Sequence, residues 1–124
     1  MKISKDIQFE DDRGLIQDLL VGESIDAVTR ITFTKGAVRA NHFHKFTTQW
    51  TLVTKGVVEY ASQPLGEEIV IEHLVAGDFV ESRPNEVHAF KGLEPAEILV
   101  FTKGPRAGFD YEKDTFRLDK NILE

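Results

Sequence analysis

The chain has 124 residues, of which 41% are hydrophobic and 29% charged, and it carries a formal net charge of −6 with no cysteine. This length predicts one compact domain, residues 1–124, and no apolar run approaches the roughly 20 residues that span a bilayer. The missing cysteines exclude disulfides, thiolate metal ligands and thiol nucleophiles, and an acidic balance without a Lys/Arg cluster argues against nucleic acid as a partner and favours a small-molecule ligand.

The chain begins without the apolar stretch of a secretory signal, so we expect a cytoplasmic protein. Further along, apolar and polar residues alternate in stretches typical of β-strands, at residues 27–34, 50–60, 67–74, 78–82 and 96–102. Turn sequences separate them at intervals of about 8–12 residues, which predicts an all-β sandwich or barrel. No window carries apolar residues at helical spacing, so we expect no helix, and residues 110–124 are predicted to form an edge strand followed by a mobile tail.

Three of the four histidines are predicted to meet at one place. His42 and His44 lie two residues apart, and on a strand such residues project to the same face. A break at residues 45–48 would return Gln49 to that face, and the turn before His88 would bring this third histidine to the same interior. His73 is predicted to be an ordinary structural residue of its strand.

The spacing around these histidines resembles the two motifs of the cupin superfamily. The first, G-x5-HxH-x4-E-x6-G, is matched by residues 36–56, with Gln49 in place of the usual glutamate. The second, G-x5-PxG-x2-H-x3-N, is matched more loosely by residues 77–92, where Gly77 and His88 fit while Arg83, Asn85 and Gly92 replace the proline, the glycine and the asparagine. The resemblance implies a single jelly-roll β-barrel and commonly a homodimer.

The cupin resemblance also implies a metal site. Its ligand positions fall on His42, His44, Gln49 and His88, and the expected ion is a divalent Zn, Fe, Ni or Mn. Gln49 supplies a neutral amide where oxygenase iron sites commonly include a carboxylate, which disfavours redox iron chemistry more than metal binding itself. A site without metal is the alternative.

Within the cupins, the stretch at residues 39–49 resembles a narrower group, the dTDP-sugar 3,4-ketoisomerases. Their pattern R-x-x-HxHK-x3-Q is matched by Arg39, His42, His44, Lys45 and Gln49. Residues 109–119 also resemble the tail of related sugar-nucleotide cupins. In that group the histidines move protons without a metal, so the resemblance implies an isomerase or epimerase acting on a sugar or a sugar-derived carbonyl compound.

Isomerising a keto sugar requires a base that removes a proton next to the carbonyl and an acid that returns one. The predicted catalytic residues are His42, His44 and Tyr60, and the predicted substrate-binding residues are Arg30, Arg39 and Lys45. Two other classes stay open. One is a metal-dependent cupin dioxygenase or lyase acting on a small carboxylate, and the other is a sugar-binding cupin without catalytic activity.

Overall fold

A computed structural model of the chain describes residues 1–105 and 108–123, and the side chains of all of these except residues 108–110. Within these ranges the chain forms twelve strands and one helix. In chain order they are β1 (Lys2–Ile3), β2 (Phe9–Asp11), β3 (Gly14–Ile16), β4 (Ala27–Phe33), β5 (Val38–Phe43), β6 (Thr48–Lys55), β7 (Val57–Pro64), β8 (Val70–Val75), β9 (Phe79–Ser82), β10 (Glu86–Gly92), β11 (Ala96–Lys103), α1 (Gly108–Lys113) and β12 (Phe116–Arg117).

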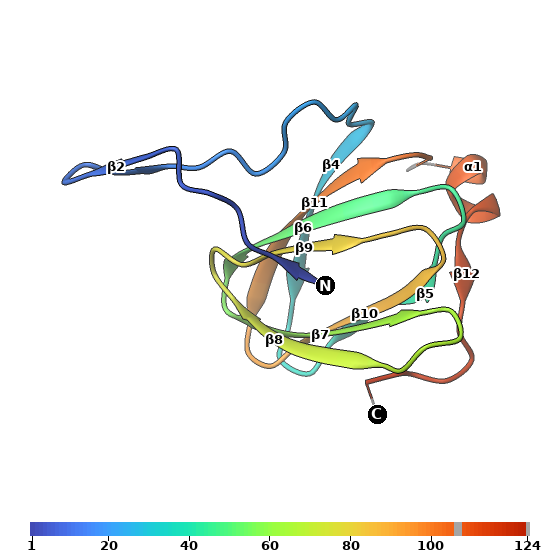
Figure 1. The fold of residues 1–124 in the computed structure, drawn as a ribbon. Coiled ribbons are helices and arrows are strands. Elements are labelled where there is room, and N and C mark those ends of the chain that lie inside the picture. Colours follow the sequence, from blue (N-terminus) through green and yellow to red (C-terminus); the bar gives the residue numbers. More distant parts are fainter. Residues whose placement is uncertain (106–107, 124) are drawn as a thin grey trace.

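Two five-stranded sheets face each other, one in the order β1-β9-β6-β11-β4 and the other in the order β12-β5-β10-β7-β8 (Figure 1). All pairings within them are antiparallel, and neighbours in space are often distant in sequence, as β6 and β11 are. The predicted all-β jelly-roll fold is therefore confirmed. Strands β2 and β3 form a separate hairpin that projects from the body.

The hydrophobic core lies between the two sheets. Both sheets contribute fully buried residues, among them Val53 and Ile98 from one sheet and Val58 and Leu74 from the other. Alternation along each strand produces this layer, because every second side chain points between the sheets. The part of the space near β5 and β10 is lined instead by polar side chains, and it forms the candidate site described below.

Glycine divides the predicted strand 50–60 into β6 and β7. Gly56 has a φ of +79°, and a Cβ at this position would lie 2.3 Å from the carbonyl oxygen of Pro95. Only glycine combines the left-handed backbone with this close approach, so the strand ends at Lys55 and restarts at Val57.

The prediction of no helix is wrong, because residues 108–113 form the short helix α1. Six residues are too few to display an amphipathic stripe, which explains why the spacing gave no signal. The predicted edge strand of the C-terminal stretch is present as β12, which pairs with β5. Among the described residues, no helix is long and apolar enough to cross a membrane.

Candidate active site

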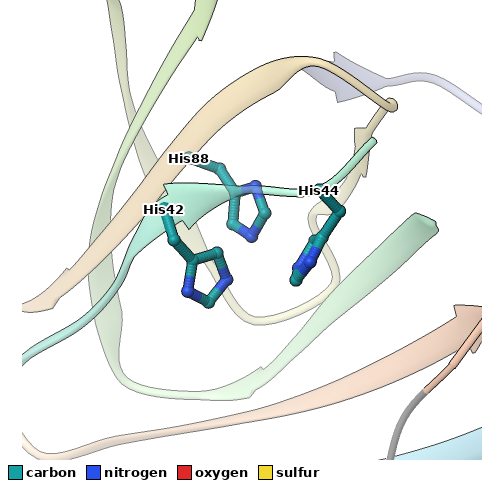
Figure 2. Close-up of side chains that lie close together, drawn as sticks. All are labelled: His42, His44 and His88. Atoms are coloured by element: carbon teal, nitrogen blue, oxygen red, sulfur yellow. The ribbon is translucent and has the colours of Figure 1, made fainter. Parts of the chain in front are cut away.

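Three buried histidines converge between the sheets. His42 lies near the end of β5 and pairs directly with His88 on the neighbouring strand β10, while His44 follows the end of β5. The ring of His42 is centred 4.6 Å from that of His44 and 4.7 Å from that of His88. One ring nitrogen from each lies within 4.8 Å of the other two, and Figure 2 shows the rings turned toward a common point.

A bulge in β5 places His42. The residues before it, Ala40 and Asn41, both have left-handed backbones, with φ values of 66° and 61°, and the pairing of β5 with β10 shifts register here. A left-handed backbone costs an L-residue roughly 1–2 kcal/mol, so surrounding contacts must hold this segment. The C-terminal segment provides them, because the backbone N–H groups of Leu118 and Ile122 donate to the main-chain and side-chain oxygens of Asn41, each at 3.1 Å.

Hydrogen bonds assign the tautomers of two of the histidines. Nδ1 of His44 lies 2.8 Å from the carbonyl oxygen of Asp114, and Nδ1 of His88 lies 3.3 Å from that of Glu86. A carbonyl oxygen can only accept a hydrogen bond, so each Nδ1 carries the proton. In a neutral ring the lone pair is then on Nε2, which is the arrangement that both metal binding and proton abstraction require.

Burial keeps His88 neutral. His88 is fully enclosed, and the loss of hydration lowers its pKa well below the usual 6.5, with the nearby rings of His42 and His44 lowering it further. A charged imidazolium at this position would lack water and face two other imidazoles. His88 therefore holds a neutral ring at physiological pH.

A cavity of about 180 Å³ opens beside the histidines. Its walls come from both sheets and from α1, and the described lining residues are Thr29, Ile31, Arg39, Ala40, His42, Gln49, Thr51, His88, Phe90, Ile98, Val100 and Tyr111. None of these is acidic. The volume equals the liquid volume of roughly six water molecules, which is room for one sugar-sized ring but not for a whole nucleotide sugar.

Gln49 and Arg39 both line this cavity, as the histidine motif suggested. Nε2 of Gln49 donates to the hydroxyl of Thr102 at 3.3 Å. The amide oxygen is the acceptor of this side chain. Arg39 is exposed at the cavity opening, where its Nε donates to the carbonyl oxygen of Thr32 at 3.1 Å and its guanidinium lies 5.7 Å from the ring centre of Phe33.

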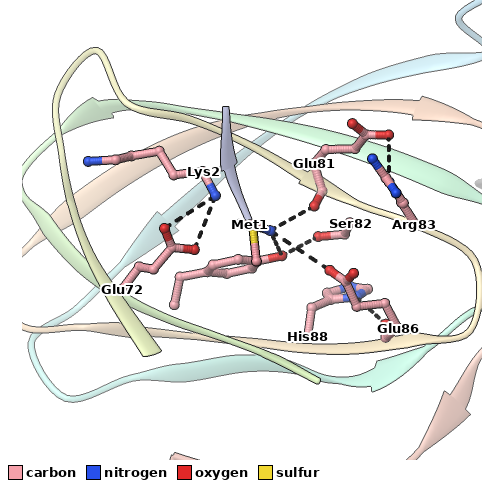
Figure 3. Close-up of polar contacts among 9 residues, drawn as sticks. Met1, Lys2, Glu72, Glu81, Ser82, Arg83, Glu86 and His88 are labelled. Atoms are coloured by element: carbon pink, nitrogen blue, oxygen red, sulfur yellow. Dashed lines mark hydrogen bonds and ion pairs between the residues drawn. The ribbon is translucent and has the colours of Figure 1, made fainter. Parts of the chain in front are cut away.

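Tyr60 does not line the cavity. Its ring is fully buried in the core, and its hydroxyl lies 2.8 Å from Ser82 Oγ and 3.4 Å from the N-terminal nitrogen of Met1. Ser82 and Met1 are both labelled in Figure 3. Burial raises the pKa of this hydroxyl above its ordinary value, which makes it a weaker acid. Tyr60 therefore packs in the core and lies apart from the cavity, and its predicted catalytic role finds no support in this position.

Arg30 and Lys45 also lie away from the cavity. Arg30 points outward from β4, between the inward-facing Thr29 and Ile31, and its Nε donates to Glu97 at 2.6 Å. The ammonium of Lys45 lies 4.6 Å from the ring centre of Phe116. The predicted substrate-binding roles of these two residues find no support in the structure.

No protein-family model matches this sequence, and a search of curated proteins finds no match. Solved structures do match the fold. A 3,4-ketoisomerase from Helicobacter canadensis superposes with a TM-score of 0.75 and 19% identity over 94% of this chain and 89% of the other. A sugar 3,4-ketoisomerase from Thermoanaerobacterium thermosaccharolyticum in complex with TDP superposes at 0.72 and 19% over 95% and 85%.

A dTDP-4-dehydrorhamnose 3,5-epimerase from Sulfolobus tokodaii matches with a TM-score of 0.70 and 17% identity, over 86% of this chain and 70% of the other. Longer proteins match as well, and the chain spans only 33% to 35% of their length. This chain has a cupin fold. At such identities the likeness concerns the fold, so the chemistry of this protein must be argued from its own side chains.

The histidines of this cupin fit a metal ion by their donor chemistry. His42, His44 and His88 can each offer one nitrogen, and the carbonyl partners of His44 and His88 resemble the outer hydrogen bonds that orient metal-bound histidines. Gln49 would add a neutral oxygen. The same three rings are equally suited to proton transfer, so their geometry fits both readings.

Sequence reasoning missed Tyr111. This residue lies on α1, lines the cavity, and has its ring centre 5.8 Å from that of His44. It was overlooked because the helix was not predicted and the segment was assigned to an edge strand and tail. The resemblance of residues 109–119 to sugar-nucleotide cupins was the one signal that pointed to this segment.

Proposed function

We propose that this cupin is an isomerase or epimerase that transfers protons on the sugar ring of a nucleotide-linked keto sugar. The observation that carries the proposal is the cavity itself. Two histidines, His42 and His88, line a space of ring size that also contains Tyr111 and Gln49, with Arg39 at its opening. The matching structures include sugar ketoisomerases and an epimerase, which supports the same class.

The reaction begins at the carbon next to the carbonyl. A base removes its proton, and the electron pair forms an enolate. In an epimerase the proton returns to the same carbon from the opposite face. In a ketoisomerase a proton goes instead to the former carbonyl carbon, while the hydroxyl on the deprotonated carbon passes its proton to the former carbonyl oxygen and becomes the new carbonyl. Neither route needs an external oxidant or reductant.

The lining residues supply these roles. We assign the base to His42, which packs against both of the other rings and lines the cavity. Tyr111 faces the same space from α1 and carries the hydroxyl that returns the proton. Gln49 and His88 hold the sugar oxygens. Because the cavity holds only the sugar, the phosphates must lie outside it, where the guanidinium of Arg39 is the nearest cationic group of the described lining.

The proposal is tested by incubating the protein with a dTDP-linked 4-keto sugar and following the product by NMR, in parallel with H42Q and in buffer with and without EDTA. We expect a 3-keto isomer or a ring epimer, formed at equal rates with and without chelator and lost in H42Q. Binding without any product would contradict the proposal and favour a sugar-binding cupin without catalytic activity.

A metal-dependent reaction is the second candidate, and the observation that favours it is the convergence of the three histidine nitrogens. His42, His44 and His88 would hold the ion with Gln49, and a bound divalent ion would polarise a substrate oxygen. Elemental analysis of protein purified without nickel resin tests this. About one equivalent of metal, lost in H44A, together with activity abolished by EDTA, would favour the metal-dependent class.

We further propose that the protein is a homodimer, and the hairpin β2–β3 is the reason. Its strands have three residues each, and Phe9, Leu15 and Ile16 are 49%, 52% and 60% exposed. An isolated two-stranded hairpin is marginally stable in water, so a partner should cover it. Residues 1–26 contain three basic and seven acidic residues, whereas residues 27–58 contain five basic residues and no acidic one, so the two segments are electrostatically complementary between two copies.

Light scattering after size-exclusion chromatography tests the dimer. We expect the doubly substituted F9S/I16S to be monomeric, while the control I71S/V75S, on the exposed edge strand β8, remains dimeric. A monomeric wild type would contradict the proposal. We also propose that residues 1–124 act as one cytoplasmic domain.

A further inference from the structure

One residue outside the cavity, Asp114, contacts four consecutive residues of the loop that bears His44, three through its carboxylate and one through its main-chain carbonyl. Asp114 follows α1 and is only 4% exposed. Its side chain accepts hydrogen bonds from the backbone N–H of Lys45 at 2.9 Å, from that of Phe46 at 3.1 and 3.2 Å, and from the hydroxyl of Thr47 at 2.6 Å. Its carbonyl oxygen accepts the Nδ1–H of His44 at 2.8 Å.

These bonds explain why a carboxylate is tolerated at a buried position. A charged group loses its hydration on burial and must regain it through hydrogen bonds. The loop donors provide this, and bonds from N–H and O–H groups to a carboxylate are among the strongest in proteins. Thr47 is itself enclosed, since a Cβ on Gly104 would lie 2.6 Å from its hydroxyl oxygen. The loop at residues 44–47 is therefore held in one conformation.

The held loop connects the two strands that carry the site. It leaves β5 after His42 and enters β6 just before Gln49. On its other side, the backbone N–H of Asp114 donates to the carbonyl oxygen of Tyr111 at 3.2 Å. One residue thus ties the loop that bears His44 to the helix that bears Tyr111.

We propose that Asp114 is a positioning residue that holds His44 as the Nδ1–H tautomer, with the Nε2 lone pair available to the site, and fixes Tyr111 relative to it. Asp114 lies outside the cavity lining and acts only through these two residues. Its effect on turnover rests on the proposed function, whereas its effect on the tautomer of His44 does not.

An amide at position 114 separates this role from general packing. Asparagine keeps the size and one acceptor oxygen, but its NH2 group would face N–H or O–H donors where the carboxylate accepts. The amide oxygen can still accept from Lys45 and Phe46, but the neutral NH2 group then faces the Thr47 hydroxyl and the second contact of the Phe46 N–H. The loop thereby loses its bonds to a charged acceptor, and we expect the bond between His44 and the carbonyl oxygen of residue 114 to loosen.

The test is ¹⁵N NMR of the histidine rings in full-length protein, comparing wild type, D114N and the control D119N, whose carboxylate is exposed. We expect wild type and D119N to show His44 as a single Nδ1–H tautomer, and D114N to show a mixture while the signals of His88 stay unchanged. His44 as a pure Nδ1–H tautomer in D114N, or as Nε2–H in wild type, would overturn the proposal.

Two further measurements complete the test. If D114N does not fold, T47V removes a single donor to the carboxylate, and it should shift the His44 signals in the same direction by less; unchanged signals would count against the role. With a turned-over substrate, D114N should lower kcat about 10- to 100-fold with little change in KM, as expected for misplaced catalytic groups. A failure of the proposed function removes only this kinetic arm and leaves the NMR result intact.

Discussion

Lowering the pH should destabilise the protein through His88. This ring is fully buried and its pKa is depressed, mainly by loss of hydration, whereas in the unfolded chain it returns to about 6.5. Below pH 6.5 the unfolded state therefore binds a proton that the folded state does not, and folding stability falls as the pH falls. Above pH 6.5 the ring is neutral in both states and contributes no slope.

The expected magnitude follows from this linkage. If the folded ring stays neutral, protonation of the unfolded state reduces the free energy of unfolding by about 1.4 kcal/mol between pH 8 and pH 5.5. Urea unfolding at both pH values, with chelator present, measures the change for wild type and H88Q. Glutamine cannot titrate, so H88Q should lose less stability than wild type by about this amount.

The matched control is H73Q. His73 lies on the outer face of β8, where its ring contacts Glu59 at 2.8 Å and its side chain is 62% exposed. We expect H73Q to keep the wild-type difference between the two pH values. Equal differences for wild type and H88Q would refute the conclusion that burial holds His88 neutral.

Three substitutions test other parts of the structure. R39A should weaken dTDP binding roughly 10- to 100-fold in calorimetry, because a charge-assisted hydrogen bond contributes about 1.5–3 kcal/mol; R30A, whose guanidinium is held by Glu97, should bind normally, and equal losses in both variants would argue against Arg39 as the phosphate contact. G56A should destabilise the protein by about 2 kcal/mol or more in urea, because its Cβ would meet the carbonyl oxygen of Pro95; a near-neutral result would mean that the turn is wrongly described. A40G should raise stability by up to about 1 kcal/mol by relieving the left-handed alanine, and a destabilised variant would show that no strain is stored there.

The strands could be predicted because the order of residue types along them reflects which side chains are buried. In β4 the inward residues are apolar or small and the outward ones are exposed, so a period of two was visible without the structure. In β11 burial also alternates, although the outward residues Leu99 and Phe101 are apolar and half-buried. The same alternation could have excluded Arg30 from the cavity lining, because it lies between Thr29 and Ile31, both of which line the cavity. The information was present, and the outward position of Arg30 follows from it.

The convergence of the histidines was predicted by an argument that holds only in part. His44 lies beyond the end of β5, so strand alternation does not place it, and the direction of His42 depends on the bulge at Ala40 and Asn41. Nothing in an alanine predicts a left-handed backbone. That conformation is imposed by pairing with β10 and by the C-terminal segment, which are both distant in sequence.

Tyr60 and Tyr111 show what a local sequence pattern cannot predict. Both were tyrosines near predicted structural elements, and only tertiary packing separates the core position of Tyr60 from the cavity position of Tyr111. Asp114 is a similar case, since a buried carboxylate cannot be distinguished from a solvated one until the loop that surrounds it is known.

Solvent exchange on a bound keto sugar tests the central claim most directly. A dTDP-linked 4-keto sugar is incubated in D2O with wild type or H42Q, and loss of the proton signal next to the carbonyl is followed by NMR. The account predicts exchange by wild type that is reduced about 10²- to 10⁴-fold in H42Q, the range expected when a general base is removed. Exchange that proceeds equally in both proteins, or no exchange by wild type despite binding, would contradict proton transfer by this histidine cluster.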